Sequence, residues 1–236
     1  MGACAGGSST TASADRARAL AARLYAGLAF DRAAAVYSLL TDHARWREDC
    51  REMAPLVPGP RVLDLGIGPG TSALEMARAD PSRAHVGLDR SARMLRLARR
   101  HAEDAGVALP LVRADALRLP FRDGALDGAT GHSFLYLLDD PARALAEVRR
   151  ALRPGGGIAF LEPRAGAARV AAALAAGGLR HALAMSMWRG MARLHRRFDE
   201  ATLPALLERA GFARARAWPV LSGFGVMATA AREEAR

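Results

Sequence analysis

The spacing of apolar residues changes along the chain. From residue 15 to 53 they recur every three or four positions, beginning with Leu20, Leu24 and Leu28, which predicts helices. From residue 61 onward, short apolar runs alternate with helical patterns. We expect strands at 61–65, 85–88, 109–113, 125–131 and 158–161, and helices at 71–79, 91–105 and 141–152. Strands that alternate with helices predict βαβ units and a mostly parallel sheet.

The last third of the chain departs from this alternation. Residues 164–197 and 198–210 carry helical patterns, and Gly211 is a natural end for the second helix. Strands are expected at 213–220 and 224–230, and their three-residue connection makes them antiparallel. The fold class is therefore α/β, with seven strands, an antiparallel C-terminal hairpin, and helices on both faces of the sheet.

Composition narrows the class of protein. The chain has 236 residues, 51% of them hydrophobic and 25% charged, which is typical of a globular protein. Cys4 and Cys50 are its two cysteines, too few for a disulfide scaffold, a four-thiolate zinc site or an iron–sulfur cluster, and no metal site is predicted.

The net charge of +10 is unevenly distributed. All 34 basic residues are arginine, and seven of them lie in residues 164–198, which contain no Asp or Glu. Part of the basic surplus therefore belongs to one segment and not to the whole surface.

A glycine-rich turn follows the first expected strand. The run from Val62 to Thr71 places Gly66, Gly68 and Gly70 between an apolar strand and a helix, where backbone can approach a ligand closely. A dinucleotide fingerprint would need glycine in place of Thr71, and the Gly-Lys-Ser/Thr of a phosphate-binding loop is absent.

Four further segments of interest follow the glycine-rich turn along the chain. They are 86–95 with Asp89, 113–121 with Asp115, 126–138, and 152–156. Together with 62–70 they resemble a class I S-adenosylmethionine-dependent methyltransferase, which has a Rossmann-like sheet. The resemblance implies S-adenosylmethionine as cofactor. It implies that Asp64 reaches the amino group of the ligand, that Asp89 accepts from both ribose hydroxyls, and that Asp115 and Ala116 meet the adenine. The full cofactor set implied is Tyr37, Asp64, Gly66, Gly68, Gly70, Asp89, Arg90, Met94, Asp115, Ala116, Gly131 and His132.

Each acidic residue also has a simpler reading. Asp64 and Asp89 could cap the helices that follow them, and Asp115 could serve a turn before Leu117. The spacing of all three at successive strand ends favours ligand binding.

Catalytic candidates follow the fourth and fifth strands. His132 titrates near neutral pH and is the best candidate for a general base, with Tyr136 beside it. A packing role for His132 is the alternative, since proximity alone promotes many methyl transfers. Glu162 is expected to point into the cleft, where it would orient the substrate or support a neighbour.

The segment 37–47 is similar to the one before the first strand in the ubiquinone/menaquinone C-methyltransferase branch, with Tyr37 and Trp46 at similar spacing. The asparagine-rich stretch of that branch is replaced by Thr41, Asp42 and His43. The resemblance implies an N-terminal helical lid at 15–55, with Tyr37 closing over the ligand or packing in the core. A disordered tail is expected at 1–14, before the lid, and the methyltransferase domain would span 56–236, after it. The lack of an apolar signal segment predicts a cytoplasmic protein.

Residues 164–198 occupy the position of a helical cap insert in this family. Leu183, Met187, Met191 and Leu194 share one expected face, with arginines on the other. This predicts either an ordinary amphipathic helix or contact with an acidic or lipidic substrate or an anionic membrane. The apolar run 170–179 is too short to span a bilayer, which takes about 20 residues.

The leading functional hypothesis is methyl transfer by in-line displacement to a small-molecule acceptor, such as a secondary metabolite or a quinone-like or lipid-like compound. The high net charge raises nucleic-acid modification as an alternative, although the Asn/Asp-Pro-Pro-aromatic motif of base N-methyltransferases is absent. A catalytically silent S-adenosylmethionine-binding protein is a third hypothesis. The oligomeric state is left open between monomer and homodimer.

Overall fold

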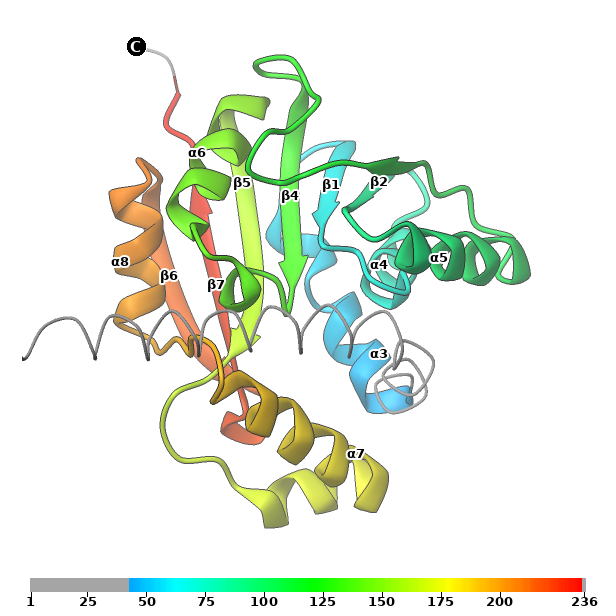
Figure 1. The fold of residues 1–236 in the computed structure, drawn as a ribbon, viewed down its shortest axis with the longest axis vertical. Coiled ribbons are helices and arrows are strands. Elements are labelled where there is room, and N and C mark those ends of the chain that lie inside the picture. The colour runs from blue at the N-terminus through cyan, green and yellow to red at the C-terminus, as the bar shows by residue number, and fades with distance from the viewer. Residues whose placement is uncertain (1–42, 235–236) are drawn as a thin grey trace, which may run out of the picture.

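The computed structural model describes residues 43–234 (Figure 1). Tyr37, the predicted tail at 1–14 and most of the predicted lid at 15–55 lie outside the described residues. The seven strands are β1 (Arg61–Leu65), β2 (Ala84–Asp89), β3 (Leu111–Arg113), β4 (Leu126–His132), β5 (Leu152–Pro163), β6 (Ala213–Val220) and β7 (Gly225–Ala231). The helices are α3 (Ala44–Arg51), α4 (Thr71–Ala79), α5 (Ala92–Asp104), α6 (Pro141–Ala151), α7 (Val170–Ala192) and α8 (Thr202–Arg209), with short 3-10 turns η1 (Ala54–Leu56), η2 (Leu135–Leu137) and η3 (Leu221–Gly223).

The strands form one sheet in the order β3-β2-β1-β4-β5-β7-β6. The first five pair in parallel, and β7 runs antiparallel to both β5 and β6, so the predicted fold class is confirmed. The chain builds outward from β1 to β3 and then returns to place β4 on the other side of β1. In open α/β sheets a ligand binds at such a reversal, beyond the carboxyl ends of the strands.

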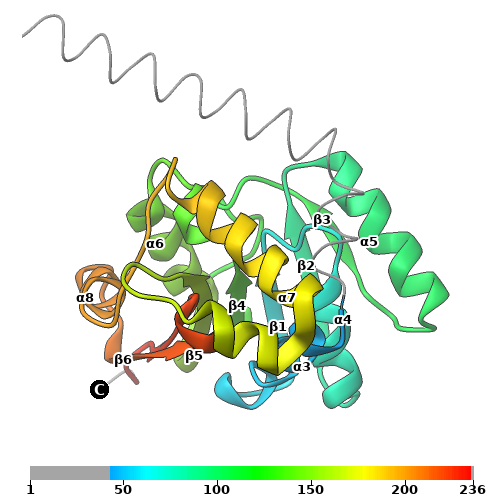
Figure 2. The same ribbon diagram turned by 90° about the horizontal axis from the view of Figure 1, so that it is seen from below.

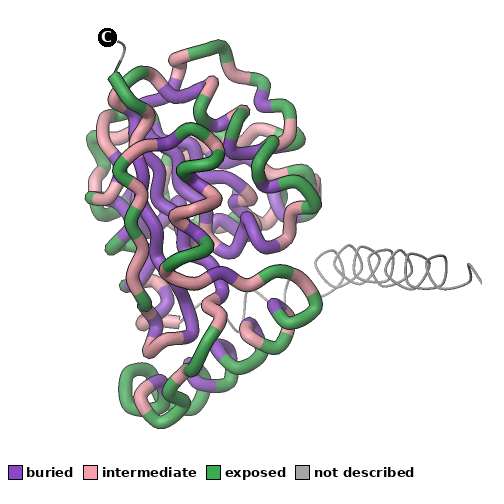
Figure 3. Tube along the Cα trace, turned by 90° about the vertical axis from the view of Figure 1, so that its left-hand side faces the viewer, coloured by how far each residue is buried: buried purple, intermediate pink, exposed green. Residues whose placement is uncertain are grey.

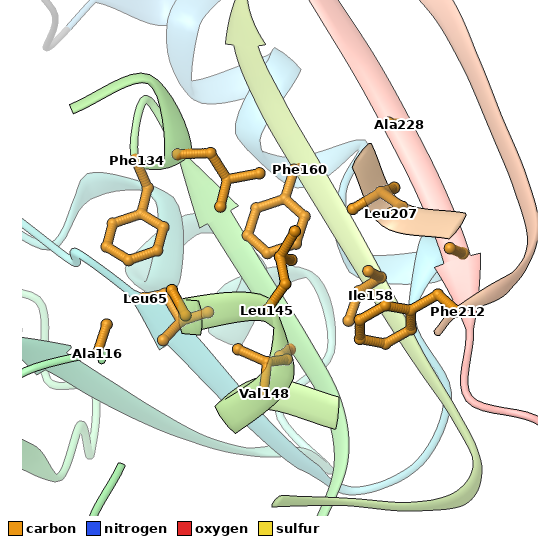
Figure 4. Close-up of a cluster of buried hydrophobic side chains, with 14 of the residues drawn as sticks. Leu65, Ala116, Phe134, Leu145, Val148, Ile158, Phe160, Leu207, Phe212 and Ala228 are labelled. Atoms are coloured by element: carbon orange, nitrogen blue, oxygen red, sulfur yellow. The ribbon is translucent and has the colours of Figure 1, made fainter. Parts of the chain in front are cut away.

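Helices cover both faces of the sheet because its central strands are apolar on both sides. On β5, Ile158 and Phe160 belong to the core under α6 and α8 (Figure 4). The alternating residues Ala159 and Leu161 belong to the core under α3, α4 and α7. The period of two along a strand thus divides β5 between two cores. Figure 2 shows α7 crossing the lower end of the molecule, as seen from below.

Most element boundaries lie within two residues of the sequence prediction, but the starts of β5 and α8 differ by more. β5 begins at Leu152, six residues before its predicted start, because a register shift in its pairing with β4 accommodates the Pro-Gly-rich segment within the strand. α8 begins at Thr202 because Phe198 is held in an isolated bridge with Arg164, and the Asp199 carboxylate accepts the Ala201 and Thr202 N–H groups.

The cap insert departs further from its prediction. α7 covers 170–192 of the expected 164–197, and Gly178 within it has φ +70°, which breaks the helical geometry. The expected apolar face is the exposed one: Leu183 and Met187 face solvent, whereas Met185 and Trp188 are buried against α3 and β7. Leucine and alanine occupy several faces of this helix, so periodicity alone did not identify the packed side.

α7 extends well beyond the apolar run 170–179. With 23 residues, it is the one helix in the described chain that is long and apolar enough to cross a membrane by length and composition. Its inner face is nevertheless packed into the protein core through Trp188 and Met185.

The amino ends of β1, β4 and β5 are tied together by one carboxylate. Asp127 is 4% exposed and accepts hydrogen bonds from the backbone and side chain of Arg61 and from Arg153. The Arg61 guanidinium, with further donors, holds the pKa of Asp127 well below its usual range.

We predict that Asp127→Asn lowers the free energy of unfolding by about 1–2 kcal/mol at pH 7, a magnitude reduced by the partial exposure of both arginines. A carboxylate with a depressed pKa stabilises the fold above its unfolded-state pKa. The difference between the two proteins should therefore persist from pH 7 to about pH 4 and shrink below it. Urea unfolding at several pH values measures this, with Asp104→Asn as a control expected within about 0.5 kcal/mol of the parent.

Candidate functional site

A cleft of about 1400 Å³ opens at the carboxyl ends of β1 to β4. Its lining brings together residues from the loops after these four strands and from the segment after α7. Predicted site residues that line it are Gly66, Gly68, Asp89, Arg90, Met94, Asp115, Ala116, His132 and Tyr136. The strand reversal between β1 and β4 therefore does gather the predicted motifs into one cavity.

The loop after β1 requires glycine for two different reasons. Gly66 has φ +61°, and a Cβ there would collide with the Phe134 ring. Gly68 has φ +55° and open space at its Cβ position, and its N–H donates to Asp89 Oδ2 at 3.0 Å. The loop backbone is thus folded tightly against the end of β2 and faces the cleft.

Asp89 combines a structural role with exposure to the cleft. Besides Gly68, it accepts the Ser91 N–H through Oδ1 at 2.8 Å. Burial raises the pKa of Asp89, and these two N–H donors lower it. Ser91 itself caps α5, as predicted, by accepting the Met94 N–H. The carboxylate is therefore held rigidly at the carboxyl end of β2.

Asp115 lies at the next strand end. It is exposed in the cleft, and its Oδ1 accepts the Leu117 N–H at 2.9 Å, which stabilises the turn after β3. The turn role and the position in the cleft lining therefore coexist, as they do at Asp89. Arg90 and Met94 lie on the same wall, which comes from the start of α5.

Three predicted cofactor residues stand behind the cleft lining. Asp64 is 1% exposed and accepts the Ser72 hydroxyl at 2.7 Å and the Thr130 hydroxyl at 2.9 Å, which joins α4 to β4. Burial raises its pKa to about 6, against the two hydroxyls that lower it. Gly70 has φ +91° at the start of α4, and Gly131 packs against Phe160. These residues shape the loop from beneath.

His132 lies at the aromatic end of the cleft. Its ring centroid is 4.4 Å from that of Trp46 and 6.2 Å from that of Trp188, and its Nδ1 lies 3.0 Å from the Ser133 hydroxyl. Burial lowers the pKa of His132 to about 3. The imidazole is therefore neutral and weakly basic across the physiological range, which weakens the general-base hypothesis for it.

Glu162 does not point into the cleft, contrary to the sequence prediction. The side chain is fully buried, and its two oxygens accept the N–H groups of Phe134, Leu135 and Tyr136. Burial raises its pKa to about 8, against these three donors. Glu162 therefore shapes the cleft wall that carries Phe134 and Tyr136 and acts only through that wall.

Sequence reasoning missed the contribution of the chain just after α7. Leu194, His195 and Arg196 line the cleft, and the His195 ring packs edge-on against Tyr136 with centroids 5.8 Å apart. The cap position implied by the resemblance was the available signal, but it did not say which residues reach inward. Within residues 43–234, no group of three or more His, Cys, Asp or Glu side chains could hold a metal ion.

Comparisons with known proteins agree with this geometry. Residues 62–156 match the family model described as a methyltransferase domain. A demethylmenaquinone methyltransferase of Thermus thermophilus is 40% identical over 118 residues, which cover 50% of this chain and 54% of that protein. Over residues 62–156 this chain is therefore similar to methyltransferase domains. The match spans about half the length of that relative and of a similar enzyme from Bordetella avium.

Solved structures show that the similarity of the fold extends beyond the segment that matches the family model. A methyltransferase of Aquifex aeolicus superposes with a TM-score of 0.63 at 17% identity, over 84% of this chain and 97% of that one. A phosphoethanolamine N-methyltransferase of Haemonchus contortus, solved with S-adenosylhomocysteine, gives 0.66 at 14% identity, over 90% and 59%.

We predict that Glu162→Ala lowers the free energy of unfolding by about 3 kcal/mol or more, because three buried N–H groups lose their acceptor. Glu162→Gln keeps one carbonyl oxygen and should lose less, about 1 kcal/mol. Chemical denaturation measures both. Equal losses would show that the three hydrogen bonds do not stabilise the wall.

Proposed function

We propose that this chain transfers the methyl group of S-adenosylmethionine to a small, largely apolar ring compound. The observation that carries the proposal is the single cleft with two chemically different ends. Its polar end holds Asp89 and Asp115 beside the glycine loop, and its aromatic end holds Trp46, His132 and Tyr136.

The polar end fits the chemistry of the cofactor. Ribose hydroxyls and an adenine amino group are hydrogen-bond donors, and carboxylates at the ends of β2 and β3 supply matching acceptors. Gly66 and Gly68 leave room for the methionine part to approach the backbone. Drug-sized ligands occupy sites of roughly 300–1000 Å³, so the larger volume here leaves room for a second molecule.

When bound, the cofactor supplies an electrophilic methyl group on a sulfonium. The chain has to hold the acceptor atom in line with that methyl, at about 3 Å, and keep water out. Trp46, Phe134 and Leu138 supply apolar walls for this purpose. His132 Nε2 is buried and has no hydrogen-bond partner among the described residues. This nitrogen could therefore serve as a positioning contact for an acceptor hydroxyl.

The acceptor class rests on the aromatic end of the cleft and on the relatives. A flat, apolar ring suits a pocket between Trp46, Tyr136 and Leu194. The Thermus thermophilus relative is named for demethylmenaquinone and a Trichormus variabilis relative for 2-phytyl-1,4-naphtoquinone. Both names describe ring compounds with long apolar tails, so we infer a quinone-like or lipid-like acceptor.

The proposal is tested by measuring S-adenosylhomocysteine release from the full chain. A reduced short-chain analogue of demethylmenaquinone should support turnover, and bulk transfer RNA should not. Turnover on the RNA alone would replace the proposal with nucleic-acid modification. Cofactor binding without turnover on any ring compound of a broad quinol and phenol panel would favour a silent binding protein.

Asp89→Ala should abolish detectable S-adenosylmethionine binding in isothermal titration calorimetry. Loss of a charge-assisted pair of hydrogen bonds costs about 3 kcal/mol or more, over a hundredfold in affinity. The control is Asp104→Asn, at the end of α5, which should bind S-adenosylmethionine as the parent does. Unchanged affinity of the Asp89 variant would refute the ribose assignment.

His132→Ala should slow methyl transfer about tenfold through lost positioning and leave the cofactor Kd within about twofold. Because the imidazole is neutral from pH 6 to pH 8, the ratio of parent to variant turnover should be the same at both values. A ratio that rises steeply with pH would identify His132 as a titrating base and contradict the positioning role.

A further inference from the structure

The large exposed apolar side chains of the described residues all fall in one short segment. They are Val170, Leu174, Leu179, Leu183, Met187 and Leu194, with exposed fractions from 38% to 67%. Figure 1 places α7 at the lower tip of the molecule, and Figure 3 shows that tip mainly in the colour of exposed positions. We call these six residues the α7 ridge.

The centre of the ridge lies on one helical face, in the part of α7 that follows the break at Gly178. Leu179, Leu183 and Met187 are four residues apart, so they lie above one another on a single helical face. The opposite face is committed to the core through Met185 and Trp188. The part of α7 after Gly178 is therefore anchored to the protein core along one side and presents apolar side chains on the other.

Arginines accompany the ridge along the chain. Arg169 precedes Val170, Arg180 follows Leu179, and Arg193 precedes Leu194. Residues 164–198 contain seven arginines and no acidic residue. Besides burial, the neighbouring charges of Arg197, Arg193 and Arg164 lower the pKa of Arg189, although Arg164 is itself paired with Glu200.

We propose that the α7 ridge docks the protein in the plane of an anionic phospholipid membrane. An apolar helix face flanked by arginine is suited to the headgroup boundary, where leucines enter the acyl region. Arginine stems can lie along the apolar surface while their guanidinium groups bind lipid phosphates. The charge selects this occupant, because a second copy of the same face would bring like-charged arginines together.

The position of the ridge connects docking to the cleft. Leu194 belongs to the ridge and also lines the cleft, as does Arg196 two residues later. Docking would place the cleft mouth beside the lipid surface, where an acceptor with an apolar tail resides. This last step rests on the proposed function, whereas membrane docking itself depends only on the ridge and its arginines.

The test is flotation of the full chain with vesicles, which measures binding without any methyl transfer and so is independent of the proposed reaction. Vesicles of phosphatidylcholine with phosphatidylglycerol should bind the protein, and binding should weaken as salt is raised. Vesicles of phosphatidylcholine alone should bind it at least tenfold more weakly. Equal binding to both would overturn the role of charge.

Two sets of variants separate the components of binding. Leu179→Ser with Leu183→Ser removes the centre of the ridge and should weaken binding at least tenfold, and Leu183→Met alone should leave it nearly unchanged. Arg169→Gln with Arg193→Gln should weaken binding about fivefold per arginine removed. The matched control is Arg99→Gln with Arg100→Gln on α5, which also removes two exposed arginines and should bind the vesicles as the parent does.

Circular dichroism should show that each variant is folded, since the substituted residues are exposed. Failure of the parent chain to bind anionic vesicles at low salt would overturn the proposal and indicate that the ridge is covered by another part of this chain. The proposal would also be overturned if the parent chain did not bind vesicles and formed a dimer that the double variant Leu179→Ser with Leu183→Ser dissociates. In that case a second copy of the chain would cover the ridge.

Discussion

The site depends on the pairing of β1 with β2 on one side and with β4 on the other. Because all three run in parallel, their carboxyl ends meet at one edge, and the chain reversal between β1 and β4 leaves a gap there. The hydrogen bond from Gly68 to Asp89 holds the glycine loop across the ends of β1 and β2. The polar end of the cleft, with the glycine loop and Asp89, follows from this arrangement.

Buried polar groups support the cleft from behind. Asp64 connects α4 and β4 through two hydroxyls, and Glu162 collects three N–H groups of the loop that carries Phe134 and Tyr136. An unpaired carboxylate in these positions would be costly, so each is surrounded by donors. Both residues act on the ligand through the loops they hold, which explains how acidic residues near an active site can remain outside its lining.

The two ends of the cleft differ in their electrostatic surroundings. At the polar end, carboxylates sit near the solvent-accessible mouth with N–H donors. At the aromatic end, two tryptophans surround His132, and the resulting desolvation keeps its imidazole neutral. The division suits a charged cofactor at one end and an apolar acceptor at the other. The α7 ridge extends the apolar end outward to the surface of the molecule.

The sequence by itself determined the order of strands and helices and the positions of Gly66, Gly68, Asp89 and Asp115, because period, glycine turns and strand ends are local properties of the chain. Only the tertiary structure decided which way Glu162 points, which face of α7 is buried, and that the residues after α7 reach the cleft. These outcomes depend on contacts between segments far apart in sequence, such as Trp188 with Trp46. Local patterns carry no information about such partners, and the burial that lowers the pKa of His132 arises from the same packing.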